Sequence, residues 1–380
     1  MADRKPEKHN SGIDMLRGLA ILSVILLHIN IRIPFSGTYA GSILPSAVYK
    51  ILFWSGYYGV CIFFVISGFL ITTSTLSKWD SLPKISIRGF YAIRFARIVP
   101  LLLGLIVILS MLHLAGITDY VIDPARTSLG RTIFAAITFH INLLEINTGY
   151  LPASWDILWS LSIEEVFYLF FPIVCLLIGK EKNFAILVII FLIISPLART
   201  FWHPENEMAD RNHFAYLDAL SLGCMAALIA KRININKTAL TTIAIAGWGL
   251  FLFVTIFRKW FSLFGLTTIG LNVTFLAIGT ALVLIWMQQR FIGGKQVSSR
   301  FTGLLRFLGR NSYEVYLTHM FVILLLVEGF NALNLTGEWV WILYISSVAI
   351  SGFVGELVAR YFSNPLNIRI REYFNPAFIQ

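Results

Sequence analysis

Charged residues are scarce in this chain of 380 residues, of which 13% are charged and 57% are hydrophobic. A soluble globular domain carries about 25% charged residues, so this composition excludes an ordinary soluble domain. The mean hydropathy of +0.76 agrees with that exclusion. The sequence therefore predicts an all-α polytopic membrane protein whose surroundings are the lipid bilayer.

Cysteine is also scarce, and the familiar catalytic motifs are missing. The cysteines are Cys61, Cys175 and Cys224, and each lies in an apolar run. They are expected to be buried neutral thiols, which excludes a disulfide framework and a cysteine-based zinc site. The sequence contains no P-loop, no HExxH and no GxSxG. We therefore predict no metal and no nucleotide hydrolysis of the P-loop type.

Basic residues outnumber acidic ones, 30 to 20, and the formal net charge is +10. In a soluble protein this excess would suggest a nucleic-acid partner. Here the basic residues gather in particular loops between apolar runs, as the positive-inside rule requires, so no nucleic-acid partner is expected. An anionic lipid or an anionic cofactor is a second use for the same charges.

Ten apolar runs are long enough, at about 20 residues each, to cross a bilayer as helices. A further run, 132–146, is short and carries His140, Asn142 and Glu145. It is expected to be a partial or re-entrant helix packed against the bundle, because exposed polar backbone cannot face lipid. The ten predicted spans are 16–33, 51–73, 98–116, 157–178, 184–201, 214–230, 239–257, 268–287, 312–330 and 339–359.

The distribution of basic residues predicts that both termini are cytoplasmic. Counting 132–146 as a full span would place the strongly basic segment 288–310 outside, against the positive-inside rule. No internal repeat and no soluble domain is evident. The predicted organisation is a polar cytoplasmic leader over 1–13, a transmembrane domain over 14–372 and a short tail over 373–380.

An ionisable side chain, His28, lies inside the first apolar run. Arg17 precedes it by eleven residues, about three helical turns, so both side chains fall on one helix face about 16 Å apart. An imidazole inside a bilayer is costly, which makes His28 a functional candidate. The alternative is a histidine that only hydrogen-bonds a neighbouring helix.

Two adjacent carboxylates, Glu164 and Glu165, form a second candidate in an apolar run. At helical spacing Glu164 shares a face with Ser160 and Tyr168, whereas Glu165 points about 100° away. We therefore expect Glu164, and not Glu165, to face a cavity and to handle protons. The alternative is a seam of Ser, Glu and Tyr hydrogen bonds between two helices.

Two arginines and two polar elements complete the candidates. Arg94 and Arg97 are three residues apart, on one helix face, and their planar guanidinium groups could clamp phosphate oxygens. The alternative is that they only fix topology, as basic residues at a cytoplasmic helix end do. Ser67 and Gly68 permit close helix approach. The late apolar run carries a polar stripe formed by Ser312, Tyr316 and His319.

These stretches, in this order, resemble the membrane-bound acyltransferase type 3 family over nearly the whole chain. Each motif alone is weak, but five motifs in register are specific, and no key position departs from the pattern. The matching elements are Asp14 with Arg17, Gly18 and His28; 63–69; Arg94 with Arg97 and Pro100; 159–164 with Tyr168 and Pro172; and 308–319.

The resemblance implies transfer of an acyl group, usually acetyl, from acetyl-CoA to a hydroxyl of a carbohydrate, a lipid-linked sugar or another acceptor. Acyl-CoA is then a donor substrate, and no bound cofactor is expected. The resemblance also implies a multi-pass protein of the bacterial cytoplasmic membrane. The chain resembles the stand-alone form of the family, without the extra esterase-like domain of some members.

The resemblance also assigns expected roles. His28 acts as the general base on the acceptor hydroxyl, or as the site of an acyl-histidine intermediate. Glu164 orients His28 or relays its proton, while Arg17, Arg94 and Arg97 hold the donor phosphates. The residues expected to line or support the cavity are Asp14, Ser67, Trp159, Ser160, Tyr168, Ser312 and His319.

The rival class is a glycolipid or proton-coupled transporter, because intramembrane His and Glu residues also form proton relays there. The lack of internal repeats and of broken helices in matching positions argues against a transporter. A third class is a non-catalytic membrane receptor. Consumption of acyl-CoA with release of free thiol separates the acyltransferase from both.

Overall fold

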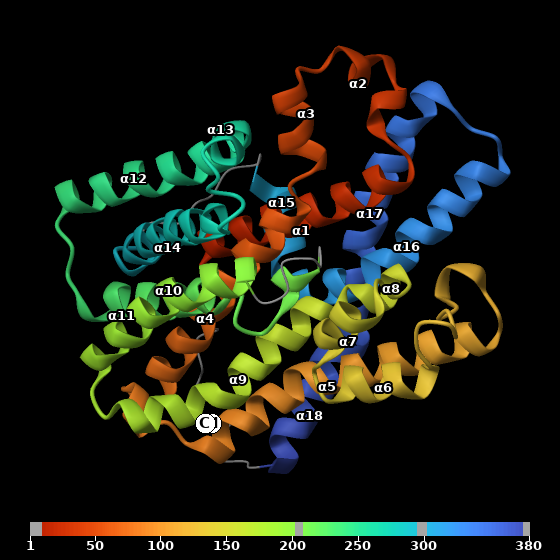
Figure 1. Ribbon diagram of the computed structural model, residues 1–380. Coiled ribbons are helices and arrows are strands. Elements are labelled where there is room, and N and C mark those ends of the chain that lie inside the picture. The colour runs from red at the N-terminus through yellow and green to blue at the C-terminus, as the bar shows by residue number, and fades with distance from the viewer. Residues whose placement is uncertain (1–9, 202–207, 295–301, 375–380) are drawn as a thin grey trace.

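The computed structural model describes residues 10–201, 208–294 and 302–374, which Figure 1 shows as a bundle of helices. Among these residues there is no strand. Because backbone polar groups in lipid must be satisfied internally, an apolar chain of this kind folds into helices. The predicted all-α polytopic class is confirmed.

Nine helical segments within the described ranges are long and apolar enough to cross a membrane, and each overlaps one predicted span, although their ends differ. They are built from α1 (Ser11–Arg32), α4 (Gly56–Trp79), α5 (Ile87–Leu114), α8 (Ala153–Asp156) with α9 (Leu158–Ile178), α10 (Phe184–Phe201), α12 (Lys237–Ile256), α14 (Leu271–Ile292), α16 (Ser312–Ala332), and α17 (Val340–Val358), which continues into α18 (Asn364–Phe374).

The remaining predicted span, 214–230, corresponds to helix α11 (Leu217–Arg232), which has only 16 residues. It is about 24 Å long, shorter than a hydrocarbon core of about 30 Å. It nevertheless runs antiparallel beside α10 over that helix's full length. Asp218 pairs with Arg199 at one end, and Arg232 pairs with Glu181, just before α10, at the other. Helix α11 therefore joins the same two ends of the bundle as α10.

The short apolar run 132–146 does not cross the bundle, but it is two helices where one was expected. α6 (Leu129–Ile137) and α7 (Ile141–Thr148) are separated by Phe139, whose φ of 56° breaks the helix. On α7, Glu145 is fully buried and forms an ion pair of 2.6 Å with Arg211. The polar residues of this run thus serve internal contacts.

The predicted ends of the transmembrane domain differ from the observed helix ends. Helix α1 begins at Ser11, where the Asn10 side chain accepts a hydrogen bond from the backbone N–H of Gly12. It therefore starts within the predicted leader, of which 1–9 lies outside the described residues. Helix α18 reaches Phe374, and 375–380 of the predicted tail also lies outside the description. Short helices occupy connecting segments: α2 (Tyr39–Ile43), α3 (Ser46–Phe53), α13 (Arg258–Leu263) and α15 (Gly303–Arg310).

Helix α1 packs against α4, α15, α16 and α17. Its contact with α15 is close enough that only glycine fits. A Cβ added at Gly18 would lie 1.8 Å from the carbonyl oxygen of Leu305, and one added at Gly309 would lie 1.7 Å from that of Asp14. Small residues permit such backbone approach between helices in lipid. The glycines of the first and last motifs therefore fix the position of α1.

Replacing Gly309 by Ala should destabilise the protein by about 1–3 kcal/mol, because the new methyl group overlaps the Asp14 carbonyl. Gly329→Ala in α16 is the matched control, since nothing lies within 4 Å of a Cβ there. Thermal unfolding of both variants in detergent, followed by circular dichroism, measures the difference. Equal unfolding midpoints would contradict the close contact of α1 with α15.

Candidate active site

A cavity of about 150 Å³ lies where α1, α4, α5, α9 and α16 converge. Apolar side chains of α4, including Val60 and Phe63, form one wall. Most of the predicted candidates share this cavity although they come from five separate helices. The predicted residues on its wall are Arg17, Ser67, Arg94, Arg97, Ser160, Glu164, Tyr168 and Ser312.

Glu164 is held by two hydroxyl donors. Ser67 Oγ on α4 donates to Glu164 Oε1 at 2.5 Å, and the hydroxyl of Tyr168, one turn along α9, donates to the same oxygen. Hydrogen bonds to a carboxylate are the strong kind. They connect α4 to α9, and they fix the orientation of the Glu164 carboxyl group at the cavity wall.

Glu165 also lines this cavity, which contradicts the expectation that Glu164 alone would face it. Two neighbouring side chains of one helix point about 100° apart, so the wall that α9 contributes is broad enough for both. Glu165 is buried, and its Oε1 has no hydrogen-bond partner among the described residues. A buried unpartnered carboxyl oxygen is costly, so Glu165 is a site residue that the face argument missed.

The arginines of the cavity have different partners. The Arg94 guanidinium lies 3.9 Å from the centre of the Tyr168 ring, and it forms no ion pair in the described structure. Arg97 is paired at 2.8 Å with Glu314, a fully buried carboxylate of α16. Arg17 Nε donates to Ser312 Oγ at 3.0 Å. Arg94 is therefore the arginine best placed to gain an anionic partner.

Glu314 is a buried charged residue beside the cavity that the sequence analysis did not single out. It lies in the first turn of α16, within the same late motif as Ser312. A carboxylate near the start of an apolar span is itself a signal. The pair with Arg97 connects α5 to α16, so Arg97 has a structural role beside any contact with a donor.

The two predicted histidines, His28 and His319, do not line this cavity but lie beside each other, with ring centroids 5.1 Å apart. Nδ1 of His28 is 2.9 Å from the carbonyl oxygen of Val24, and Nδ1 of His319 is 2.6 Å from that of Tyr316. A carbonyl oxygen only accepts, so each neutral ring carries its proton on Nδ1 and keeps a lone pair on Nε2. Nε2 of His319 is buried and has no partner in the described part of the chain.

Tyr316 connects the cavity to this histidine pair. It lines the cavity, its hydroxyl lies 2.7 Å from Ser160 Oγ, and its ring centroid is 5.7 Å from that of His319. The polar stripe Ser312, Tyr316 and His319 therefore runs from the arginines to the histidines along one face of α16. On α1, Arg17 and His28 are separated by about 16 Å along the helix axis, also from the arginines toward the histidines.

Asp14 and Trp159 lie away from the cavity. Asp14 is buried, and its Oδ2 is 3.9 Å from Arg310 Nε. The Trp159 ring packs under the Arg211 guanidinium at 4.8 Å and against Tyr216 at 5.9 Å. Both positions are those of supporting residues.

No metal cluster is formed by the described residues, where no three His, Cys, Asp or Glu side chains gather to hold an ion. Cys61, Cys175 and Cys224 are buried free thiols. The cavity chemistry consists of guanidinium, carboxyl, hydroxyl and imidazole groups. Such groups bind anions and move protons.

Residues 10–361 match the family model described as an acyltransferase domain. The chain belongs to this acyltransferase family. The motifs that carried the resemblance lie on α1, α4, α5, α9 and α15–α16, so the family's motif residues surround the cavity described above. The predicted family and enzyme class are confirmed.

Named relatives agree with this membership. The chain is 26% identical over 375 residues to the O-acetyltransferase OatA of Staphylococcus aureus (strain NCTC 8325 / PS 47), covering 93% of this chain and 57% of that protein. It is 24% identical over 404 residues to the putative O-acetyltransferase SAR0937 of Staphylococcus aureus (strain MRSA252), covering 99% and 61% respectively. The chain thus spans about three fifths of the length of these relatives. No solved structure matches it.

Glu164→Gln should lower the turnover of acyl transfer by about two orders of magnitude, and Glu165→Gln should lower it less. Glutamine keeps the size of the side chain and removes the ionisable group, so the pair of variants tests charge at each position. Initial rates at matched expression decide between them. If Glu165→Gln is the inactive variant, the unpartnered carboxyl is the functional one.

Proposed function

We propose that this chain is an O-acetyltransferase of the bacterial cytoplasmic membrane that transfers acetyl from acetyl-CoA to a hydroxyl of a carbohydrate or other acceptor. The names of its relatives support O-acetyl transfer. The observation that carries the proposal is the 2.9 Å contact of His28 Nδ1 with the Val24 carbonyl oxygen, because a ring that donates through Nδ1 keeps a lone pair on Nε2.

The proposed donor site is the arginine end of the first cavity. CoA is anionic, and guanidinium groups bind phosphate oxygens in a planar, bidentate manner. Arg94 forms no ion pair with the described residues, and Arg17 Nε donates to a serine hydroxyl. An extended pantetheine arm is long enough to cover the roughly 16 Å between the levels of Arg17 and His28.

The proposed orientation keeps both termini cytoplasmic. Helix α11 joins the same two ends of the bundle as α10, so it supports a tenth crossing and an even number of spans. The arginine end of the cavity is then cytoplasmic, where acetyl-CoA is made. The acceptor approaches from the other side.

In the proposed reaction the acceptor hydroxyl attacks the thioester carbonyl carbon while His28 Nε2 takes its proton. A C–O bond forms, the C–S bond breaks, and the leaving CoA thiolate takes the proton back from the imidazolium. The products are the O-acetyl ester and free CoA thiol. The neighbouring His319 ring is uncharged and keeps a lone pair on Nε2, so it does not repel the proton that His28 takes up. An acetyl-histidine formed on His28 is the variant of this mechanism.

His28→Ala should abolish acetyl transfer, with a loss of two to four orders of magnitude in rate, roughly that of a general base. The protein should still insert and fold, because His28 makes its side-chain hydrogen bond only within α1. Release of free thiol from acetyl-CoA, measured in membranes with and without acceptor, tests this. Near-normal release by the variant removes His28 from the mechanism, and no release by the wild type favours a transporter or receptor.

Arg94→Ala should raise the KM for acetyl-CoA about tenfold or more, because a guanidinium–phosphate contact is lost. Arg88→Ala is the matched control, since Arg88 is an exposed residue near the start of the same helix. The removed charge is equal in the two variants. A similar rise in KM for both would mean that the arginines act only through general surface charge or topology.

A further inference from the structure

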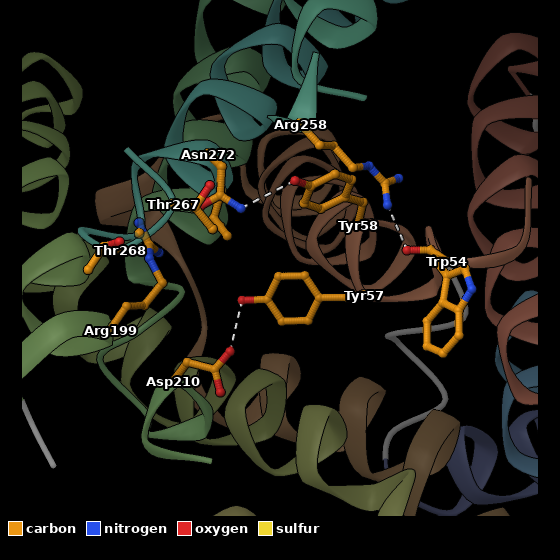
Figure 2. A pocket seen from close by; sticks show the side chains of 11 residues that line it. Trp54, Tyr57, Tyr58, Arg199, Asp210, Arg258, Thr267, Thr268 and Asn272 are labelled. Atoms are coloured by element: carbon orange, nitrogen blue, oxygen red, sulfur yellow. Dashed lines mark hydrogen bonds between the residues drawn. The ribbon is translucent and has the colours of Figure 1, made fainter. Parts of the chain in front are cut away.

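A second cavity, of about 330 Å³, lies at the N-terminal end of α4, beside Tyr57 and Tyr58. Figure 2 shows its wall, to which the start of α4, the end of α10, the turn before α11, the start of α13 and the segment leading into α14 contribute. Its size is within the range of small-molecule sites, about 300–1,000 Å³. In the proposed orientation this end of α4 is extracytoplasmic.

A buried arginine at this cavity has one unused donor. Arg199 is paired through both Nη atoms with Asp218, and its side chain is only 3% exposed. Its Nε has no hydrogen-bond partner in the described structure. Gly270, with φ of 66°, lies over this nitrogen, and a Cβ there would approach it to 2.7 Å. Because Asp218 neutralises Arg199, this N–H is a buried donor at the cavity wall that brings no net charge with it.

Acceptor groups face the same space. Asp210 accepts a hydrogen bond from the Tyr57 hydroxyl through Oδ2 at 3.0 Å, and its Oδ1 accepts none from the described residues. Asn272 donates to the Tyr58 hydroxyl at 3.3 Å, and its carbonyl oxygen accepts no hydrogen bond from the described residues. Burial raises the pKa of Asp210, while the Tyr57 hydroxyl opposes that shift.

The remaining wall is aromatic, and its charge is balanced. Tyr57, Tyr58 and Trp54 present ring surface, and Arg258 stacks on Tyr58 at 4.5 Å while it donates to the Trp54 carbonyl oxygen. Arg258 is positive, and Asp210 opposes it across the cavity (Figure 2). A phosphate would meet that carboxyl group, and an acyl chain would leave the polar groups unsatisfied. Alternating donors and acceptors beside aromatic rings suit a neutral, polyhydroxylated ring.

We propose that this second cavity binds the sugar ring of the acceptor, held by Asp210, Asn272 and Arg199 against the Tyr57 and Tyr58 rings. The identification of this sugar as the acceptor substrate rests on the proposed function. The binding of a neutral sugar at this cavity does not depend on it.

The second cavity is separated from the first by a thin aromatic layer. The Tyr216 hydroxyl donates to that of Tyr57 at 2.9 Å, and the Tyr216 ring lies 4.7 Å from that of Phe64. Phe64 lines the first cavity, and Tyr57 lines the second. Tyr57 and Phe64 are two helical turns apart on one face of α4. A ring bound here therefore lies next to the layer that borders the first cavity.

Cysteine labelling of the full chain in membrane vesicles tests the site. The native cysteines are buried, so Thr268→Cys introduces a reactive thiol at an exposed position on the cavity wall. Saturating glucose or N-acetylglucosamine, added on the extracytoplasmic side, should slow its labelling by an impermeant maleimide at least about tenfold. Inorganic phosphate at the same concentration should not slow it.

Ser262→Cys is the control, since Ser262 is exposed on α13 but does not line the cavity. Its labelling should be the same with and without sugar. In the Thr268→Cys background, Asn272→Ala should raise the sugar concentration for half-protection about tenfold, the equivalent of about 1.4 kcal/mol. Thr267→Val, at an exposed wall position, should raise it in the same direction even if Asn272→Ala fails to fold.

No protection by either sugar, or protection by phosphate instead, overturns the proposal. Half-protection that is unchanged in both wall variants overturns the assignment to these residues. The labelling uses no acetyl-CoA, so it is independent of the reaction. Sugar protection without sugar-stimulated release of CoA thiol would mean that the site stands and that the proposed acetyl transfer fails.

Discussion

The structure depends on ion pairs between charged side chains that the sequence places inside an apolar bundle. An unpaired buried ion costs several kcal/mol (roughly 3–5 when one partner of a pair is removed). Arg97 with Glu314 joins α5 to α16, and Arg199 with Asp218 joins α10 to α11. Each pair links helices that are distant in sequence or differ in direction. The ion pairs therefore select one arrangement among the many that apolar packing alone would allow.

The two cavities lie where this pairing is incomplete. Among the residues that the structure describes, Arg94 at the first cavity forms no ion pair, and neither Glu165 Oε1 nor Arg199 Nε at the second cavity's edge has a hydrogen-bond partner. Unsatisfied polar groups in native interiors are few and call for an explanation. The proposed ligands would complete them: a phosphate for Arg94, and hydroxyl groups for Glu165 and Arg199. The same residue types thus serve stability and recognition. In a stabilising ion pair the protein supplies both partners, whereas at a cavity the ligand supplies one of them.

The sequence predicts the fold well because hydrophobic length is a local property. The nine long spans of the described ranges could be predicted from run length alone, and α11 was predicted as a further span although its helix has only 16 residues. The break at Phe139 could not be predicted, because a single left-handed residue leaves no periodic signal.

Site residues that belong to sequence motifs could be predicted. Site residues that only the tertiary fold brings together could not. Arg17, Glu164 and Ser312 were found because each stands out on an apolar helix. Glu314 was overlooked although it carries the same signal, and Glu165 was excluded by an argument that assumed a narrow cavity face. The wall of the second cavity comes from five segments, and none of Asp210, Asn272 or Thr268 forms a pattern in sequence.

Helix α4 supplies part of the wall of both cavities, through Tyr57 and Tyr58 at one end and through residues between Val60 and Leu70 along the rest. A helix moves as a rod, so a displacement that reshapes one wall also reshapes the other. Any ligand that shifts α4 must then alter the affinity of the opposite cavity, and thermodynamics requires that the effect be equal in both directions.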